Sequence, residues 1–156
     1  MVTIRKALPG DADFIASHAH RLLNFSLPGW RSNEKEKMIK ADIQHITNAL
    51  LKDDPEDCTF IAVDEENKAC GFMRVVLLKD YYTGEKHAHV NDIVVTKESE
   101  GKGVGRLLLQ KADEWAIDNN VRWITLNVFE ENRRARAVYE MQGYHMEWIK
   151  YLKELH

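Results

Sequence analysis

The sequence predicts one domain of the mixed α/β class over residues 1–156, and three observations lead to this prediction. The length of 156 residues suits a single domain with one sizeable core. Hydrophobic residues make up 44% of the chain and charged residues 30%, which excludes wholesale disorder and fibrous classes. Strand-like and helical patterns also alternate in the order strand, helix, helix, three strands, helix, strand, helix, strand.

The first third of the chain reads as a short strand followed by two helices. Residues 2–7 alternate between apolar and polar side chains, as a strand does, and stop at a Pro-Gly pair. An aspartate-capped helix follows over residues 11–23, and residues 24–30 break it with Pro and Gly. A second helix with one apolar side is expected over residues 33–51.

The middle of the chain predicts three consecutive strands. Residues 59–63 and 70–78 are apolar runs separated by a polar turn, a pattern typical of an antiparallel hairpin. A loop at residues 81–85 leads into a further strand over residues 87–95.

The last third alternates helix and strand. Residues 104–118 carry apolar side chains at helical spacing. Residues 123–128 read as a strand, and residues 132–141 as a helix stopped by Gly143. A final strand is expected over residues 144–152.

Charge and cysteine content exclude several classes of function. The net charge of −3 argues against a nucleic-acid partner, since such proteins are more often basic. Cys58 and Cys70 make neither a disulfide framework nor a metal-ligand pattern, so no metal is expected. No apolar run approaches the ~20 residues of a membrane span, and the N-terminus lacks the apolar region of a signal peptide. These features predict a cytoplasmic protein without membrane contact.

A glycine-rich turn stands between a predicted strand and a predicted helix. Three of the eight glycines, Gly101, Gly103 and Gly105, alternate there with Lys102 and lead into Arg106. Glycines allow an anion to approach the backbone, and the first N–H groups of a helix are free to bind one. The alternative is a tight turn with no ligand. The spacing matches neither a Walker A loop nor a dinucleotide fingerprint.

Two motifs in this order resemble the GNAT family of N-acetyltransferases. Residues 95–105 are similar to its acyl-CoA motif, V-x-P-x-x-[RQ]-G-x-G-x-[GA], with Lys97 at the proline position and Glu100 at the Arg/Gln position. Downstream, residues 126–144 are similar to L-x-V…N-x-x-A-x-x-x-Y-x-x-x-G-[FY]. The resemblance implies a GNAT-like fold: a central, mostly antiparallel twisted sheet of six or seven strands flanked by about four helices.

The resemblance also implies acetyl-CoA or coenzyme A as the cofactor and places its binding residues. The backbone of the strand before the glycine turn would pair with the pantetheine arm, and the glycine turn would hold the pyrophosphate. The implied cofactor-binding residues are Ile93, Val94, Val95, Glu100, Gly101, Lys102, Gly103, Val104, Gly105, Arg106, Asn127, Asn132 and Ala135.

Asn132, Ala135 and Tyr139 share one face of the last helix, because they lie at i, i+3 and i+7. By resemblance, Asn132 hydrogen-bonds the cofactor, Ala135 leaves room for it, and Tyr139 is the general acid for the departing thiolate. A phenol pKa of ~10 beside a thiol pKa of ~8.5 suits that role. The structural alternative makes Asn132 a helix N-cap and Tyr139 a half-buried core aromatic.

An attacking amine must lose a proton, so a general base is expected. Relatives often carry an acid on the fourth strand where this chain has Asn91. Asp92 is the first candidate for the base and His89 the second. Regular strand alternation would place these two side chains on opposite faces of the sheet.

The acceptor site is expected, by resemblance, between the N-terminal helices and the loop after the third strand. Phe25, Trp30, Tyr81 and Tyr82 are the candidates for an aromatic wall around an amine. A small amine, an aminoglycoside-like polyamine and a peptide amine all suit the nearby acids. The leading hypothesis is therefore acetyl transfer to a primary amine by direct attack in a ternary complex.

Two other readings stay open. A non-catalytic acyl-CoA-binding module would suit the departures at Asn91 and Glu100, and a nucleotide-binding regulator is a weaker alternative. A homodimer is compatible with all of these hypotheses.

Overall fold

The computed structural model describes residues 1–25 and 27–156 and contains one five-stranded sheet. The strands follow the sequence order β1-β2-β3-β4-β5 across the sheet, and only the β4–β5 pair is parallel. The strand bounds are β1 Thr3–Lys6, β2 Asp57–Val63, β3 Ala69–Lys79, β4 Lys86–Val95 and β5 Ile124–Leu126.

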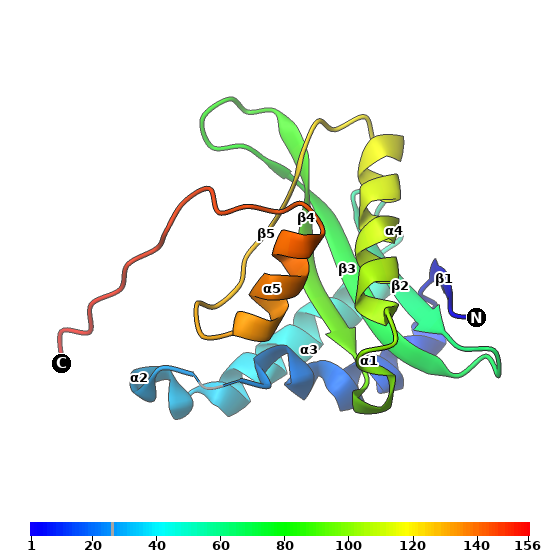
Figure 1. Cartoon of the computed structure of the whole chain (residues 1–156), viewed down its shortest axis with the longest axis horizontal. Helices are drawn as coiled ribbons and strands as arrows, with labels where there is room; N and C mark the ends of the chain where they lie inside the picture. The colour runs from blue at the N-terminus through cyan, green and yellow to red at the C-terminus, as the bar shows by residue number, and fades with distance from the viewer. Residues whose placement is uncertain (26) are drawn as a thin grey trace.

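Helices cover both faces of this sheet (Figure 1). The α-helices are α1 Ala12–His18, α2 Gly29–Ser32, α3 Lys35–Leu51, α4 Val104–Asp118 and α5 Arg133–Met141. Three 3-10 helices connect them: η1 Pro9–Asp11, η2 Ala19–Leu23 and η3 Lys97–Ser99.

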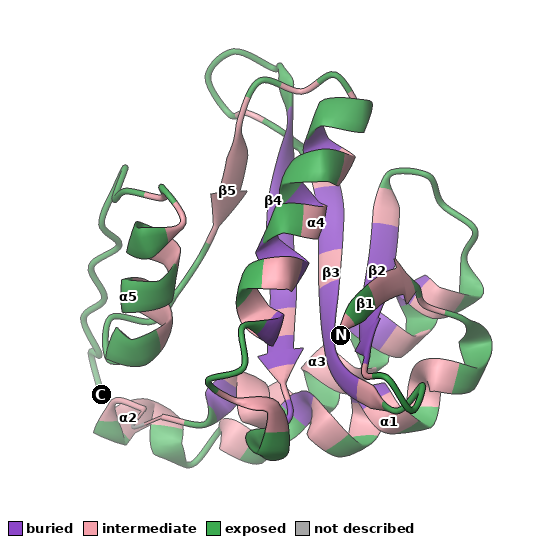
Figure 2. Ribbon diagram, turned by 45° about the vertical axis from the view of Figure 1, so that its right-hand side comes forward, coloured by how far each residue is buried: buried purple, intermediate pink, exposed green. Residues whose placement is uncertain are grey.

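Two apolar clusters form the core, one on each face of the sheet. On one face α1 and α3 contribute Ile15 and Ile46, which pack with Phe72 and Val94. On the other face α4 supplies five buried residues, Val104, Leu108, Leu109, Ala112 and Ala116. The β-strands between the layers are the most buried elements of the chain (Figure 2), so the predicted mixed α/β class is confirmed.

Gly71 allows α4 to lie close against the sheet. A Cβ at this position would lie 2.8 Å from the carbonyl oxygen of Val94 and 3.2 Å from Cγ1 of Val104. Any side chain there would therefore push β4 and α4 away from β3, and both elements line the site described below.

The expected sheet of six or seven strands is wrong, because residues 144–152 form no strand. Gly143 adopts φ 91° at the end of α5, and the chain beyond Tyr144 leads away from the body of the domain (Figure 1). Trp148 and Tyr151 are 70% and 90% exposed, so this segment has no sheet to pair with among the described residues.

The helix count also differs from the expected four. The N-terminal region divides into α1, η2, α2 and α3, because Pro28 and Gly29 interrupt the helical pattern. Ser26, within the expected break at residues 24–30, lies outside the described residues. None of the described helices has the length and apolar content needed to cross a membrane.

Candidate active site

A β-bulge in β4 opens the sheet. Arg74 of β3 pairs with Asp92, but the next residue, Val75, pairs with Val90, so Asn91 is an extra residue in β4. The parallel pairing with β5 also stops at Val90. Beyond this point β4 and the chain after β5 diverge (Figure 2), and residues 91–95 have no strand partner on that side among the described residues.

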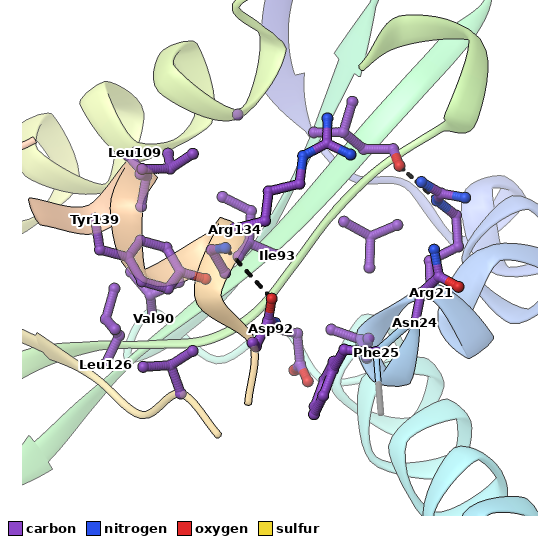
Figure 3. A pocket seen from close by; sticks show the side chains of 18 of the residues that line it. Arg21, Asn24, Phe25, Val90, Asp92, Ile93, Leu109, Leu126, Arg134 and Tyr139 are labelled. Atoms are coloured by element: carbon purple, nitrogen blue, oxygen red, sulfur yellow. Dashed lines mark hydrogen bonds between the residues drawn. The ribbon is translucent and has the colours of Figure 1, made fainter. Parts of the chain in front are cut away.

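A pocket of about 860 Å³ occupies this opening (Figure 3). Its walls come from η2, from β4 after Val90, from the glycine turn and first turns of α4, from residues 126–129, and from α5. Segments far apart in the sequence therefore meet around one cavity. A volume of this size is typical of small-molecule and cofactor sites.

The glycine turn forms one end of this pocket. Gly101 and Gly103 have φ values of 73° and 81°, in the left-handed region that favours glycine. Gly103 is the N-cap of α4, and no side chain caps the helix. The first N–H groups of α4 therefore remain available to an anion at the positive end of the helix dipole.

Glu100, at the position where the motif usually has Arg or Gln, is held between two arginines. It pairs with Arg21 of η2 and with Arg134 of α5, whose Nη1 lies 2.8 Å from Oε2. Hydrogen bonding to Arg134, together with the charge of Arg21, lowers the pKa of the Glu100 carboxyl. The acid is thus neutralised, and it draws two cations to the glycine turn.

Arg21 additionally fixes the end of β4. Its Nε donates a hydrogen bond of 2.7 Å to the carbonyl oxygen of Val95, and the side chain is only 13% exposed. The sequence analysis missed this residue, because its partners lie more than seventy positions away and no local pattern marks it.

Tyr139 of α5 lines the pocket from the side opposite η2, near Leu109, Val90 and Leu126 (Figure 3). Its ring packs edge-on against Tyr144 at 6.0 Å between centroids. Burial raises the pKa of the Tyr139 phenol, so the group is a proton donor at neutral pH.

Asn132 and Ala135 line the same wall. The Asn132 side chain accepts a hydrogen bond of 3.3 Å from the Ala135 amide and so caps α5. Its capping role does not exclude contact with a ligand, because the amide nitrogen remains free of hydrogen bonds among the described residues.

Asp92 lies on the floor of the pocket and is only 6% exposed. Its Oδ2 accepts a hydrogen bond of 3.1 Å from Asn91 and lies 3.8 Å from Nη1 of Arg74. Arg74 is already engaged by two hydrogen bonds, of 2.9 and 2.8 Å, to Asp57. Burial raises the pKa of Asp92 to about 6, which suits a group that exchanges protons near neutrality.

His89 lies outside the pocket lining. Its Nδ1 is 2.8 Å from Oγ1 of Thr125, and burial lowers the pKa of the ring. The expectation that His89 and Asp92 face opposite ways is wrong: they pair with Val76 and Arg74, which lie two positions apart and share one face of β3. The extra residue at Asn91 shifts the alternation by one.

The expected aromatic wall is present only in part. Phe25 lines the pocket and packs against Phe129, with 5.5 Å between ring centroids. Trp30 is not part of the lining. Tyr81 and Tyr82 sit in the β3–β4 turn, where they are 88% and 79% exposed and also outside the lining.

All expected cofactor-binding residues except Lys102 line the pocket. A carboxylate that the sequence analysis did not single out, Asp42 of α3, also lines it. A signal was present in the sequence, because Asp42 interrupts the apolar stripe between Ile39 and Ile46. No described group of His, Cys, Asp and Glu residues could hold a metal ion.

The fold and the pocket are those of an acyl-CoA-dependent acetyltransferase, and the comparisons establish the family. The chain belongs to the GNAT family: the model of the Acetyltransferase (GNAT) family matches residues 19–144. It is 25% identical over 143 residues to an uncharacterized N-acetyltransferase of Bacillus subtilis, covering 92% of this chain and 89% of the relative. It is 28% identical over 145 residues to an aminoglycoside N(6')-acetyltransferase of Stenotrophomonas maltophilia, covering 91% and 85%.

Solved structures show the same fold. A mutant of the BH1408 protein from Bacillus halodurans superposes with a TM-score of 0.79 at 19% identity, covering 98% of this chain and 99% of the other. The aminoglycoside 6'-N-acetyltransferase of Acinetobacter baumannii superposes with a TM-score of 0.70 at 16% identity, covering 99% and 98%.

Proposed function

We propose that this chain transfers the acetyl group of acetyl-CoA to a primary amine by direct attack in a ternary complex. The observation that carries the proposal is the single pocket at the β4 bulge. It brings a buried carboxylate, Asp92, and a buried phenol, Tyr139, together with the anion-binding turn of α4.

The pocket residues fit coenzyme A. The free N–H groups of the first turn of α4 suit a pyrophosphate, and Arg106 and Arg134 add positive charge around them. The unpaired edge of β4 over residues 91–95 suits an amide-containing arm, which can add hydrogen bonds as a further strand would. When bound, the cofactor supplies the acetyl group as a thioester, whose carbonyl carbon is the electrophile.

Asp92 suits the role of general base. With a pKa of about 6 it is ionised at neutral pH, yet it is basic enough to accept a proton from an ammonium directly or through water. It stands on the face of the sheet that α3 covers, so the amine approaches from that side.

Tyr139 suits the role of general acid, because its raised pKa keeps the phenol protonated. The acceptor nitrogen loses two protons in the reaction. Asp92 takes the first and releases it to solvent, whereas Tyr139 gives its proton to the departing sulfur and is reprotonated by the second.

Direct attack is favoured over a cysteine acyl-enzyme. Cys58 and Cys70 are buried, neither lines the pocket, and burial raises the pKa of both thiols. A nucleophilic cysteine needs a lowered pKa and access to the substrate.

The proposal is tested by Tyr139→Phe with Tyr144→Phe as the matched control. Tyr144 lies beside Tyr139, but its hydroxyl is buried without a hydrogen-bond partner and does not line the pocket. We expect Tyr139→Phe to lower kcat at least about tenfold in a thiol-release assay on a panel of amines. Acetyl-CoA should raise the melting temperature of both variants as it does that of the wild type.

Two results would contradict this proposal. Equal turnover of Tyr139→Phe and the wild type would remove Tyr139 from the acid role. Stabilisation by coenzyme A without turnover on any amine would instead favour the non-catalytic acyl-CoA-binding module, which the Asn91 and Glu100 departures suggest.

A further inference from the structure

The charged groups of the pocket are divided between its two ends. Four arginines line the end formed by η2, the α4 turn and α5: Arg21, Arg106, Arg133 and Arg134. Of the lining acids, Glu100 is paired with two of these arginines, and Glu131 lies exposed in the loop before α5. The lining acids from α3 and from the floor of β4 are Asp42 and Asp92.

Asp92 is only partly neutralised by the protein. Its Oδ2 has the Asn91 amide at 3.1 Å and Arg74 at 3.8 Å, whereas its Oδ1 accepts no hydrogen bond among the described residues. Oδ1 is also absent from the fully enclosed atoms that lack a partner. The small exposed fraction of this residue therefore includes a carboxylate oxygen open to the pocket.

Asp42 has no partner at all within the described part of the chain. No hydrogen bond or ion pair engages its carboxylate, although the side chain is half-buried in the pocket wall on α3. Burial raises the pKa of Asp42, and the charge of Asp42 contributes to the raised pKa of Asp92. A half-buried carboxylate without a cation is unfavourable, so the missing cation points to a ligand.

We propose that Asp42 binds a second cationic group of the acceptor, so that the acceptor is a diamine or polyamine, sugar amines included. This inference rests on the proposed function, because one amine must reach Asp92 for acetylation while the other lies against Asp42. A monoamine would leave Asp42 buried without a cation. The lining aromatic Phe25 adds an apolar surface for the linker between the two amines.

The test compares α,ω-diaminoalkanes with 1-aminoalkanes of the same chain length, and adds an aminoglycoside, on the wild type and on Asp42→Asn. Glu36→Gln is the matched control, since Glu36 is an exposed acid of α3 outside the pocket lining. Calorimetric titration in the presence of coenzyme A measures amine binding, and thiol release from acetyl-CoA measures turnover. Melting temperatures confirm that each variant is folded.

We expect Asp42→Asn to weaken diamine binding and to raise its KM about tenfold, the effect of one charge-assisted contact, while kcat changes little. The monoamine KM should not change, Glu36→Gln should match the wild type, and Asp42→Glu should recover part of the loss. Diamine binding that depends on Asp42 without turnover would support the inference and contradict the proposed catalysis.

Three outcomes would overturn the inference. One is equal binding of monoamine and diamine by the wild type. Another is a loss in Asp42→Asn that is the same for both amines. The third is the absence of binding by any diamine or aminoglycoside. Efficient turnover of monoamines without an effect of Asp42 would leave the proposed function standing and remove only the second binding group.

Discussion

Replacing Asp92 by Asn should make the folded protein more stable at neutral pH while it abolishes activity. The pKa of Asp92 is raised from its usual 3.8 to about 6, chiefly by burial. An acid with a raised pKa binds its proton more tightly in the folded than in the unfolded state. Stability therefore falls as pH rises from about 4 to about 6, and the full cost remains at higher pH.

The magnitude follows from the pKa difference. At ~1.4 kcal/mol per pKa unit, the ionised form of Asp92 costs about 3 kcal/mol at neutral pH. Asparagine keeps the size of the side chain and removes this cost, but Arg74 loses a contact at 3.8 Å. Since Arg74 retains both hydrogen bonds to Asp57, we expect a net gain of about 2 kcal/mol, or roughly 4 to 8 °C in melting temperature.

The assay is urea unfolding of wild type and Asp92→Asn at a series of pH values from about 4 to about 8. The advantage of Asp92→Asn should be largest above pH 6 and should shrink toward pH 4. Asp11→Asn is a control of opposite sign, because hydrogen bonds from Arg5 lower the pKa of Asp11. That variant should be less stable than the wild type at neutral pH and lose its deficit as pH falls through the lowered pKa.

Activity gives the second half of the same prediction. The kcat/KM of the wild type should rise with pH through about 6 as Asp92 ionises, and Asp92→Asn should lower it by at least about a hundredfold. An Asp92→Asn protein that is no more stable at neutral pH, or whose advantage does not vary with pH, would refute the burial argument. Retained activity would refute the role as base.

Two further predictions concern the turn and the sheet. Glu100→Gln should lower the Kd for coenzyme A roughly two- to fivefold at low salt, because its two arginine partners become free for phosphate; weaker or unchanged binding in a calorimetric titration would contradict this account. Gly71→Ala should destabilise the protein by about 1–3 kcal/mol, because the added Cβ lies 2.8 Å from the Val94 carbonyl oxygen. Gly10→Ala, which meets no atom within 4 Å, is the matched control in thermal unfolding.

Much of the fold was predictable because its signals are local. The helix of α4 follows from apolar residues at helical spacing, and the hairpin of β2 and β3 from two apolar runs around a polar turn. The last expected strand failed for a physical reason: alternation over residues 144–152 shows that the segment can pair, but a strand forms only where a partner edge is within reach.

The site divides in the same way. The sequence alone determined the glycine turn and the shared face of Asn132, Ala135 and Tyr139, because both depend on neighbours within one element. Only the tertiary structure decided where Asp92 points, since the bulge at Asn91 arises from the register between β3 and β4. It also brought Arg21 to Glu100 across 79 positions and set Asp42 in the pocket wall. Such contacts depend on how separate elements pack, which no local pattern encodes.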